Sequence, residues 1–246
     1  MNKKLLPAFL IVALLFTGFY SCTKKNEHYT SDYSRNYFPL TIGKSVVYDV
    51  DSVLWDDNVD VRSLHHYQMR WTIADTFRDD LFRLSYRIQT YIRKQDTLEW
   101  ATHKVIYITP TDNTVEYVEE NLRFIKLIFP IQNGGTWKGN ALINPLDKDY
   151  LYFQNWNYYY DNYSEPFSNG FIQFENTVTV RAVDDTLGNP ETRPTEYAFK
   201  TYGKEVYGQG IGMVYREITH WVYDPSKPGT PFRDGYSVVM KAVDYN

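Results

Sequence analysis

Apolar and polar residues alternate with a period of two over long stretches of this chain. In LFRLSYRIQTYIR, residues 81–93, the alternate positions Phe82, Leu84, Tyr86, Ile88 and Ile92 are apolar, while the positions between them are mostly polar. Because successive side chains of a β-strand point to opposite faces, this pattern predicts a long antiparallel strand with one buried face. Residues 66–77 repeat the pattern, and Asp79-Asp80 supplies a turn between the two strands.

Further segments with strand character are separated by turn-forming residues. They are residues 44–53, 98–109, 122–129, 172–183, 195–206, 213–223 and 236–245. The aromatic content of 17% agrees with this, since flat rings pack well on a pleated surface. Strands continue across the midpoint without a clear linker, and no long amphipathic helix is predicted. We therefore expect an all-β protein in which residues 37–246 form one domain, a single large curved antiparallel sheet arranged as a half-barrel or a sandwich.

The first 21 residues have the three-part layout of a secretory signal peptide. Lys3 and Lys4 give a positive start, and residues 5–20 form an uncharged, largely apolar run before Ser21. This run is shorter than the roughly 20 residues that span a bilayer comfortably, so a cleaved signal is favoured over a retained membrane anchor.

Cys22, the only cysteine of the chain, follows this run directly. The boundary Phe19-Tyr20-Ser21-Cys22 resembles a bacterial lipoprotein signal of the Bacteroidota type, in which the cysteine is lipidated after cleavage. That resemblance implies a palmitate-bearing membrane anchor at Cys22, and Thr23, where an Asp would favour the inner membrane, implies the outer membrane. An ordinary secretory signal with an incidental cysteine is the alternative. Residues 22–36 are polar and contain turn formers, so they are predicted to be a flexible tether between the lipid and the domain.

Two further segments, NYFPLTIGKSVVYDV and VYGQGIGMVYREI, carry a second resemblance. They are similar to the FPL..G and GxG-V segments of a family of uncharacterised bacterial outer-membrane lipoproteins. The resemblance covers short stretches and implies an envelope location without an established activity. Whether the domain faces the periplasm or the cell surface is left open.

Motifs for catalysis, cofactors and metals do not stand out. Gly208, Gly210 and Gly212 are followed by a strand-like pattern and not by a helix, which favours a glycine-bent strand or bulge over a phosphate-binding loop. The five histidines have no metal-ligand spacing, a GxSxG nucleophile motif is absent, and the adjacent acidic pairs are typical of solvated turns. We therefore predict no catalytic residues, no metal site and no cofactor.

The segment YLYFQNWNYYYDNYSEPF, residues 150–167, is the richest in aromatic side chains. Rings that stack on sugars beside amide groups make a contact surface for a glycan or a peptide, and the candidate ligand-binding residues are Trp156, Tyr158, Tyr159 and Tyr160. The alternative is that these rings cover an open end or flank of the sheet.

Three functions are consistent with these features. The first is a lipid-anchored cell-envelope protein that acts as a non-catalytic binding or structural module for a glycan, protein or lipid partner. The second is a carrier or chaperone for a lipid or another apolar ligand, and the third, an enzyme, is a glycan hydrolase. A net charge of -4 without a basic cluster argues against a nucleic-acid partner. An apolar cavity would favour the carrier, an exposed aromatic platform would favour glycan or protein binding, and convergent carboxylates in a cleft would favour the hydrolase.

Overall fold

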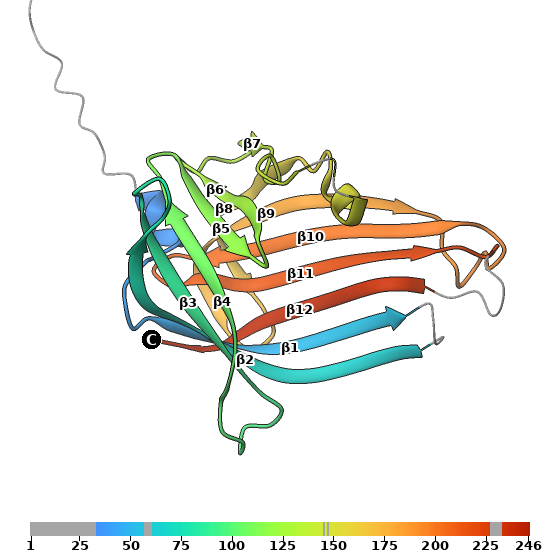
Figure 1. Cartoon of the computed structure of the whole chain (residues 1–246), viewed down its shortest axis with the longest axis horizontal. Coiled ribbons are helices and arrows are strands. Elements are labelled where there is room, and N and C mark those ends of the chain that lie inside the picture. Colours follow the sequence, from blue (N-terminus) through green and yellow to red (C-terminus); the bar gives the residue numbers. More distant parts are fainter. Residues whose placement is uncertain (1–32, 57–60, 145, 147, 227–232) are drawn as a thin grey trace, which may run out of the picture. The chain divides into compact units, whose positions relative to one another are not determined.

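The computed structural model describes residues 33–56, 61–144, 146, 148–226 and 233–246. These residues form one antiparallel sheet of twelve strands with two short 3-10 helices, as Figure 1 shows. The strands are β1 (Ser45–Asp56), β2 (Val61–Arg78), β3 (Leu84–Arg93), β4 (Ala101–Pro110), β5 (Thr114–Glu119), β6 (Leu122–Ile128), β7 (Thr136–Trp137), β8 (Tyr158–Ser168), β9 (Gln173–Leu187), β10 (Ala198–Gly208), β11 (Gly212–Tyr223) and β12 (Arg233–Tyr245). The helices are η2 (Tyr33–Tyr37) and η3 (Lys148–Phe153). The prediction of an all-β fold with a single curved antiparallel sheet is confirmed.

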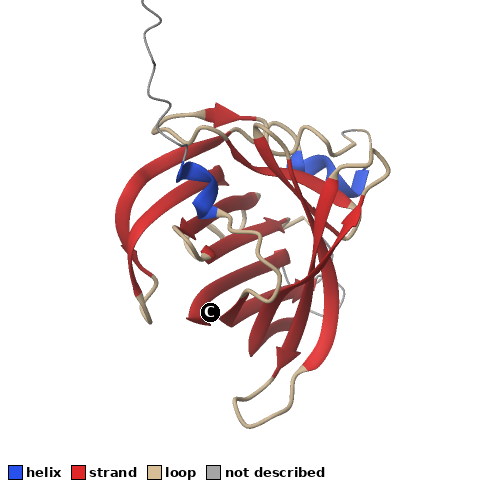
Figure 2. Ribbon diagram, turned by 90° about the vertical axis from the view of Figure 1, so that its left-hand side faces the viewer, coloured by secondary structure: helices blue, strands red, loops and turns tan. Residues whose placement is uncertain are grey.

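Strands that follow one another in the chain are mostly neighbours in the sheet. The order is β6-β5-β4-β3-β2-β1-β12-β11-β10-β9-β8-β7, so the first and last strands pair with each other in the middle of the sheet. The strands curve round an interior in Figure 2, and the sheet is a nearly closed barrel. Inward-facing apolar side chains from strands on all sides fill this interior, which is why period-two alternation runs through the sequence.

The two edges of the sheet, β6 and β7–β8, meet through contacts outside the regular strand ladder. The Ile125 backbone N–H donates to the Gly139 carbonyl at 2.7 Å, and the Trp137 indole N–H donates to the Ile125 carbonyl at 2.8 Å. The Tyr160 hydroxyl both accepts from the Ile128 N–H and donates to the Ile128 carbonyl, each at 2.7 Å. These bonds satisfy backbone groups of an edge strand that would otherwise lack partners, and they draw the barrel together.

Replacing Tyr160 by phenylalanine is expected to lower the free energy of unfolding by about 1–3 kcal/mol. The buried ring stays, but the backbone N–H and carbonyl of Ile128 lose their common partner. Urea unfolding followed by tryptophan fluorescence measures the change. Tyr159→Phe is the control, because the neighbouring side chain is 42% exposed, and equal effects of the two substitutions would contradict a role of Tyr160 in closing the barrel.

Two predicted features are placed differently by the structure. The strand predicted from residue 81 begins at Leu84, and Phe82 and Leu84 are exposed instead of buried, because Phe82 lies in the β2–β3 turn with φ +59°. The aromatic segment, predicted only as a contact or covering surface, folds into η3 and the strand β8. Gly208, Gly210 and Gly212 belong to the β10–β11 hairpin, where Gly210 and Gly212 have positive φ, so no helix follows them to bind a phosphate.

The described residues before the predicted domain start at residue 37 contact the sheet. The Gly210 N–H donates to the Asn36 carbonyl at 2.7 Å, and Tyr37 is buried in the core. The predicted signal peptide, the predicted lipidation site Cys22 and most of the predicted tether lie outside the described residues. Among the residues that are described, no helix is long and apolar enough to cross a membrane.

Candidate functional site

A cavity of about 360 Å3 lies inside the barrel. Its walls come from β2, β4, β5, β6, β8, β11 and β12, from η3 and from the segment between η3 and β8. One part of the wall is apolar and aromatic: Tyr67, Met69, Trp71, Leu122, Phe124, Tyr150, Tyr152, Phe153, Trp156, Tyr158, Ile218, Tyr236, Val238 and Met240. The other part carries ionisable groups: His103, Lys104, Glu119, Glu120, Lys126 and Arg216. The site therefore combines an apolar body with a charged wall.

The four aromatic residues predicted to bind a ligand do not share one surface. Trp156 and Tyr158 are buried and line the cavity, Tyr160 is buried at the barrel seam, and Tyr159 is exposed. The Trp156 indole N–H donates to the Tyr152 carbonyl at 2.6 Å, and the Tyr158 hydroxyl donates to Asn140 Oδ1 at 2.9 Å. Their polar atoms are thus directed at the protein and their rings face the interior. A ligand-binding role stays a prediction for Trp156 and Tyr158, now as part of an internal wall.

An ion pair crosses the interior of the barrel. Lys126 on β6 and Glu205 on β10 are both buried, and Lys126 Nζ lies 2.7 Å from Glu205 Oε1. The Tyr207 hydroxyl donates to the other carboxylate oxygen at 2.6 Å. These two strands are far apart in the sheet order, so the contact exists only because the sheet curves back on itself.

Arg216 links this pair to a second carboxylate nearer the rim of the cavity. Its Nε lies 3.5 Å from Glu205 Oε1, and its NH1 lies 3.6 Å from Glu119 Oε2. Glu119 also accepts a hydrogen bond from the Tyr117 hydroxyl at 2.6 Å and contacts Lys104. The charged groups therefore form one continuous network from the β4–β5 strands to β10.

The network keeps its carboxylates ionised. Burial alone would raise the pKa of Glu119, but the charges of Arg216 and Lys104 outweigh it and lower that pKa to about 2. The pKa of Glu205 is likewise lowered, because Lys126 and Arg216 outweigh its burial. Burial lowers the pKa of Lys126, and Glu205 offsets this only in part. Three cations, Lys104, Lys126 and Arg216, thus face three carboxylates: the well-buried Glu119 and Glu205, and the exposed Glu120, which pairs with Lys104 at 3.2 Å.

The acidic residues of the structure bear on two kinds of site considered from the sequence, a glycan hydrolase site and a metal site. Glycoside hydrolysis needs a carboxyl group whose pKa is raised so that it can donate a proton, and the pKa values of Glu119 and Glu205 are shifted the opposite way. Asp49, Asp51 and His66 also lie together, but Asp51 and His66 are exposed and the group is not among the cavity-lining residues. His66 Nδ1 is 2.9 Å from Asp51 Oδ1, so a histidine–carboxylate pair accounts for that cluster.

The charged residues of the cavity were missed in the sequence, although a signal was present. In VYREITHWV the apolar positions Val214 and Ile218 share a strand face with Arg216, and in FIKLI Lys126 shares a face with Phe124 and Ile128. A charged residue at a core-facing position is costly unless it is paired, so it marks a candidate site.

Comparison with known proteins adds little to this description. No family model matches the chain, and no curated protein matches it. One solved structure to which the chain is similar is from Bacteroides fragilis and is described as a "putative exported protein with YmcC-like fold". The two share 13% sequence identity with a TM-score of 0.39, over 85% of this chain and 98% of that one. At this level of similarity the neighbour assigns neither a function nor a site to the chain.

Proposed function

We propose that the protein is a lipid-anchored protein of the bacterial outer membrane whose barrel binds a small ligand with an apolar body and an acidic group. The observation that carries this proposal is the internal cavity, whose lining is mostly aromatic and aliphatic and includes the buried cations Lys126 and Arg216. The protein acts by binding and not by catalysis. This unites the binding module and the carrier that the sequence favours.

The size and walls of the cavity support a small ligand. Pockets that hold small molecules are typically about 300–1,000 Å3 and are mostly apolar with a few placed polar groups. A volume of about 360 Å3 lies at the lower end of this range, so it suits one acyl chain or one ring system better than a lipid with several chains. Met69, Val238 and Met240 offer flexible or aliphatic contacts, while Trp156 and Tyr158 offer flat ones.

The charge of the network supports an acidic group on the ligand. Lys126 and Arg216 both line the cavity, and they share the carboxylate of Glu205 as a common partner. Burial lowers the pKa of Lys126, and a further anion nearby would stabilise its charged form. A carboxylate or phosphate on the ligand would supply it.

The anchor is supported by the signal-like residues 1–21 and by the position of Cys22. Labelling cells with radioactive palmitate tests it, with the Cys22→Ala variant as control. Label that persists in this variant would remove the anchor from the proposal without touching the cavity.

Ligand binding is tested with the full-length protein and two fluorescent probes, a fatty acid carrying a fluorophore and its methyl ester. We expect the acid to bind about tenfold more tightly than the ester, as a hydrogen bond to a charged group contributes about 1.5–3 kcal/mol. Val238→Trp fills the cavity and is expected to weaken binding of the acid at least tenfold.

Val239→Trp is the matched control, because Val239 is the next residue of β12 and points to the other face of the sheet, away from the cavity. Circular dichroism checks that both variants fold. Absence of binding for both probes, together with mass spectra showing that no small molecule co-purifies, would overturn the proposal and leave the network a purely structural role.

A further inference from the structure

One end of the barrel is the place where the chain enters the fold. The strand pairing puts the start of β1 and the β2–β3, β4–β5, β8–β9 and β10–β11 turns at this end, which we call the entry end. η2 lies across it, because Asn36 bonds to Gly210 of the β10–β11 turn and Arg35 bonds to the carbonyls of Thr111 and Asp112 of the β4–β5 turn. In Figure 1, η2 and the β2–β3 turn lie together on the left.

The β2–β3 turn presents two large apolar side chains to solvent at the entry end. Leu81 is 71% exposed and Phe82 is 82% exposed. Ser45, the first residue of β1, pairs with Thr72 of β2. Because β2 continues for six more residues to Arg78, the β2–β3 turn projects beyond the start of β1. Exposed Ile42 and Phe171 come from other turns at the same end. The adjacent pair Leu81 and Phe82 is the most exposed of these four residues, and a large exposed apolar surface indicates an interaction site.

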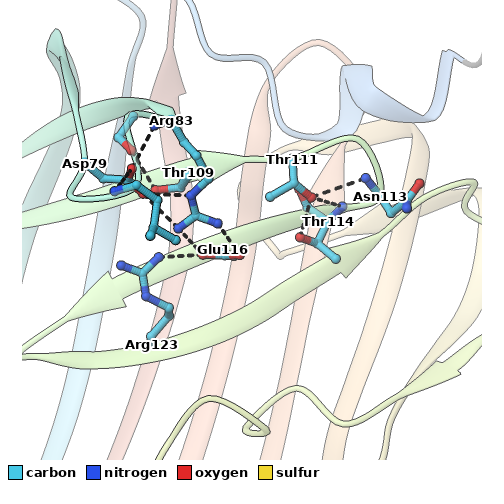
Figure 3. A network of polar contacts seen from close by, with 10 residues as sticks. Asp79, Arg83, Thr109, Thr111, Asn113, Thr114, Glu116 and Arg123 are labelled. Carbon is cyan, nitrogen blue, oxygen red and sulfur yellow. Dashed lines mark hydrogen bonds and ion pairs between the residues drawn. The ribbon is translucent and has the colours of Figure 1, made fainter.

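The turn is held in one conformation by a polar network, shown in Figure 3. Asp79 Oδ1 accepts the N–H groups of Leu81 at 3.0 Å and Arg83 at 2.8 Å. Arg83 donates to Asp79 Oδ2 and to both carboxylate oxygens of Glu116, at 2.9 and 3.1 Å, and Arg123 contacts Glu116 from β6. This network stabilises a bulky residue at φ +59°, a conformation that such residues seldom adopt. Leu81 and Phe82 are therefore held in a fixed conformation, so little conformational entropy is lost when they contact a partner.

The length of chain before Tyr33 limits how far the entry end can lie from a membrane that holds Cys22. Cys22 lies eleven residues before Tyr33, and an extended chain spans at most about 3.5 Å per residue. If Cys22 carries the lipid, the entry end lies within about 40 Å of the bilayer surface. Leucine and phenylalanine are the side chains that bury in the boundary between headgroups and acyl chains.

We propose that the entry end docks on the membrane that holds the lipid of Cys22, with Leu81 and Phe82 inserted among the lipid headgroups. The proposal rests on the anchor in the proposed function but not on ligand binding. It also orients the cavity, since the β5–β6 turn with Glu119, Glu120 and Leu122 lies at the opposite end and its rim then faces away from the membrane.

Spin labelling of the full, lipidated chain in vesicles of phosphatidylethanolamine and phosphatidylglycerol tests the docking. With Cys22 acylated, an introduced cysteine is the sole free thiol. A nitroxide on Leu81→Cys is expected to collide with oxygen several-fold more often, relative to a water-soluble nickel complex, than one on Leu64→Cys. Leu64 is the matched control because it is 66% exposed and lies on β2 near the opposite end of the barrel.

A second variant separates docking from simple proximity. In a Leu81→Ser/Phe82→Ser background, a label on Ile42→Cys is expected to lose its preference for oxygen. Equal exposure of the Leu81→Cys and Leu64→Cys labels to the nickel complex, in protein that still floats with the vesicles, would overturn docking while leaving the anchor intact. Shielding of the Leu81→Cys label from both reagents would also overturn it, in favour of a protein partner such as a second copy. Protein that does not float with the vesicles at all would instead contradict the anchor.

Discussion

Replacing Lys126 by methionine is expected to lower the free energy of unfolding by about 3–5 kcal/mol, the range for breaking a buried ion pair from one side. Methionine fits the apolar stem of the lysine, but Glu205 then loses the ammonium group 2.7 Å from its carboxylate. The nearest remaining cation, Arg216, is 3.5 Å away and is shared with Glu119. Urea unfolding followed by tryptophan fluorescence measures the loss.

The double variant Lys126→Met/Glu205→Gln is expected to recover at least half of this loss, because it removes the uncompensated charge together with its partner. Arg193→Met is the comparison for an ion pair at the surface. Arg193 and Glu196 are both largely exposed, so its effect should stay below about 1 kcal/mol. A Lys126→Met effect as small as that of Arg193→Met would show that the interior is accessible to water.

The long strand β2 was predictable because its central part alternates strictly. Residues 67–73 alternate between apolar and polar side chains without interruption, and they lie inside this strand. The exception at Phe82 has a local cause. The Asp79 carboxylate caps the N–H groups of Leu81 and Arg83, and this turn removes Phe82 from the strand that its apolar character had indicated.

β8 was missed for a different physical reason. Tyr158 and Tyr160 do alternate between buried positions with exposed Tyr159 between them. The pattern then breaks, because Asn162 and Ser164 adopt positive φ and the register with β9 shifts between Asp161 and Glu165. Asn and Ser in such a stretch are the residues that also form turns, so the sequence alone does not separate an irregular strand from a loop.

Only part of the candidate site could be predicted from the sequence. That Arg216 and Lys126 sit on apolar strand faces follows from period two. The contact between Lys126 and Glu205 could not be predicted in this way, because β6 and β10 are not neighbours in the sheet. No local sequence pattern indicates that the sheet closes far enough to bring these two strands together. The cavity likewise depends on closure of the sheet, because its lining side chains come from seven strands, from η3 and from connecting segments.

Replacing Gly235 by alanine is expected to lower the free energy of unfolding by about 2–5 kcal/mol. Gly235 in β12 has φ +138° and stands between Trp55 of β1 and Trp221 of β11. A Cβ atom there would lie 2.1 Å from the His220 carbonyl oxygen and 2.7 Å from the Trp221 Cα, and both are backbone atoms that no rotamer change can move. The expected loss combines about 1–2 kcal/mol for the positive φ with about 1–3 kcal/mol for displacing β11.

Gly43→Ala separates these two contributions. Gly43 also has a positive φ, +88°, but no atom lies within 4 Å of the position its Cβ would take. This variant should therefore show only the backbone cost, about 1–2 kcal/mol, in the same urea experiment. Equal losses for the two glycines would mean that β11 and β12 separate at Gly235 without resistance. A larger loss for Gly235→Ala would instead show that close approach of the β11 backbone, and not conformational freedom alone, requires glycine between the two tryptophans.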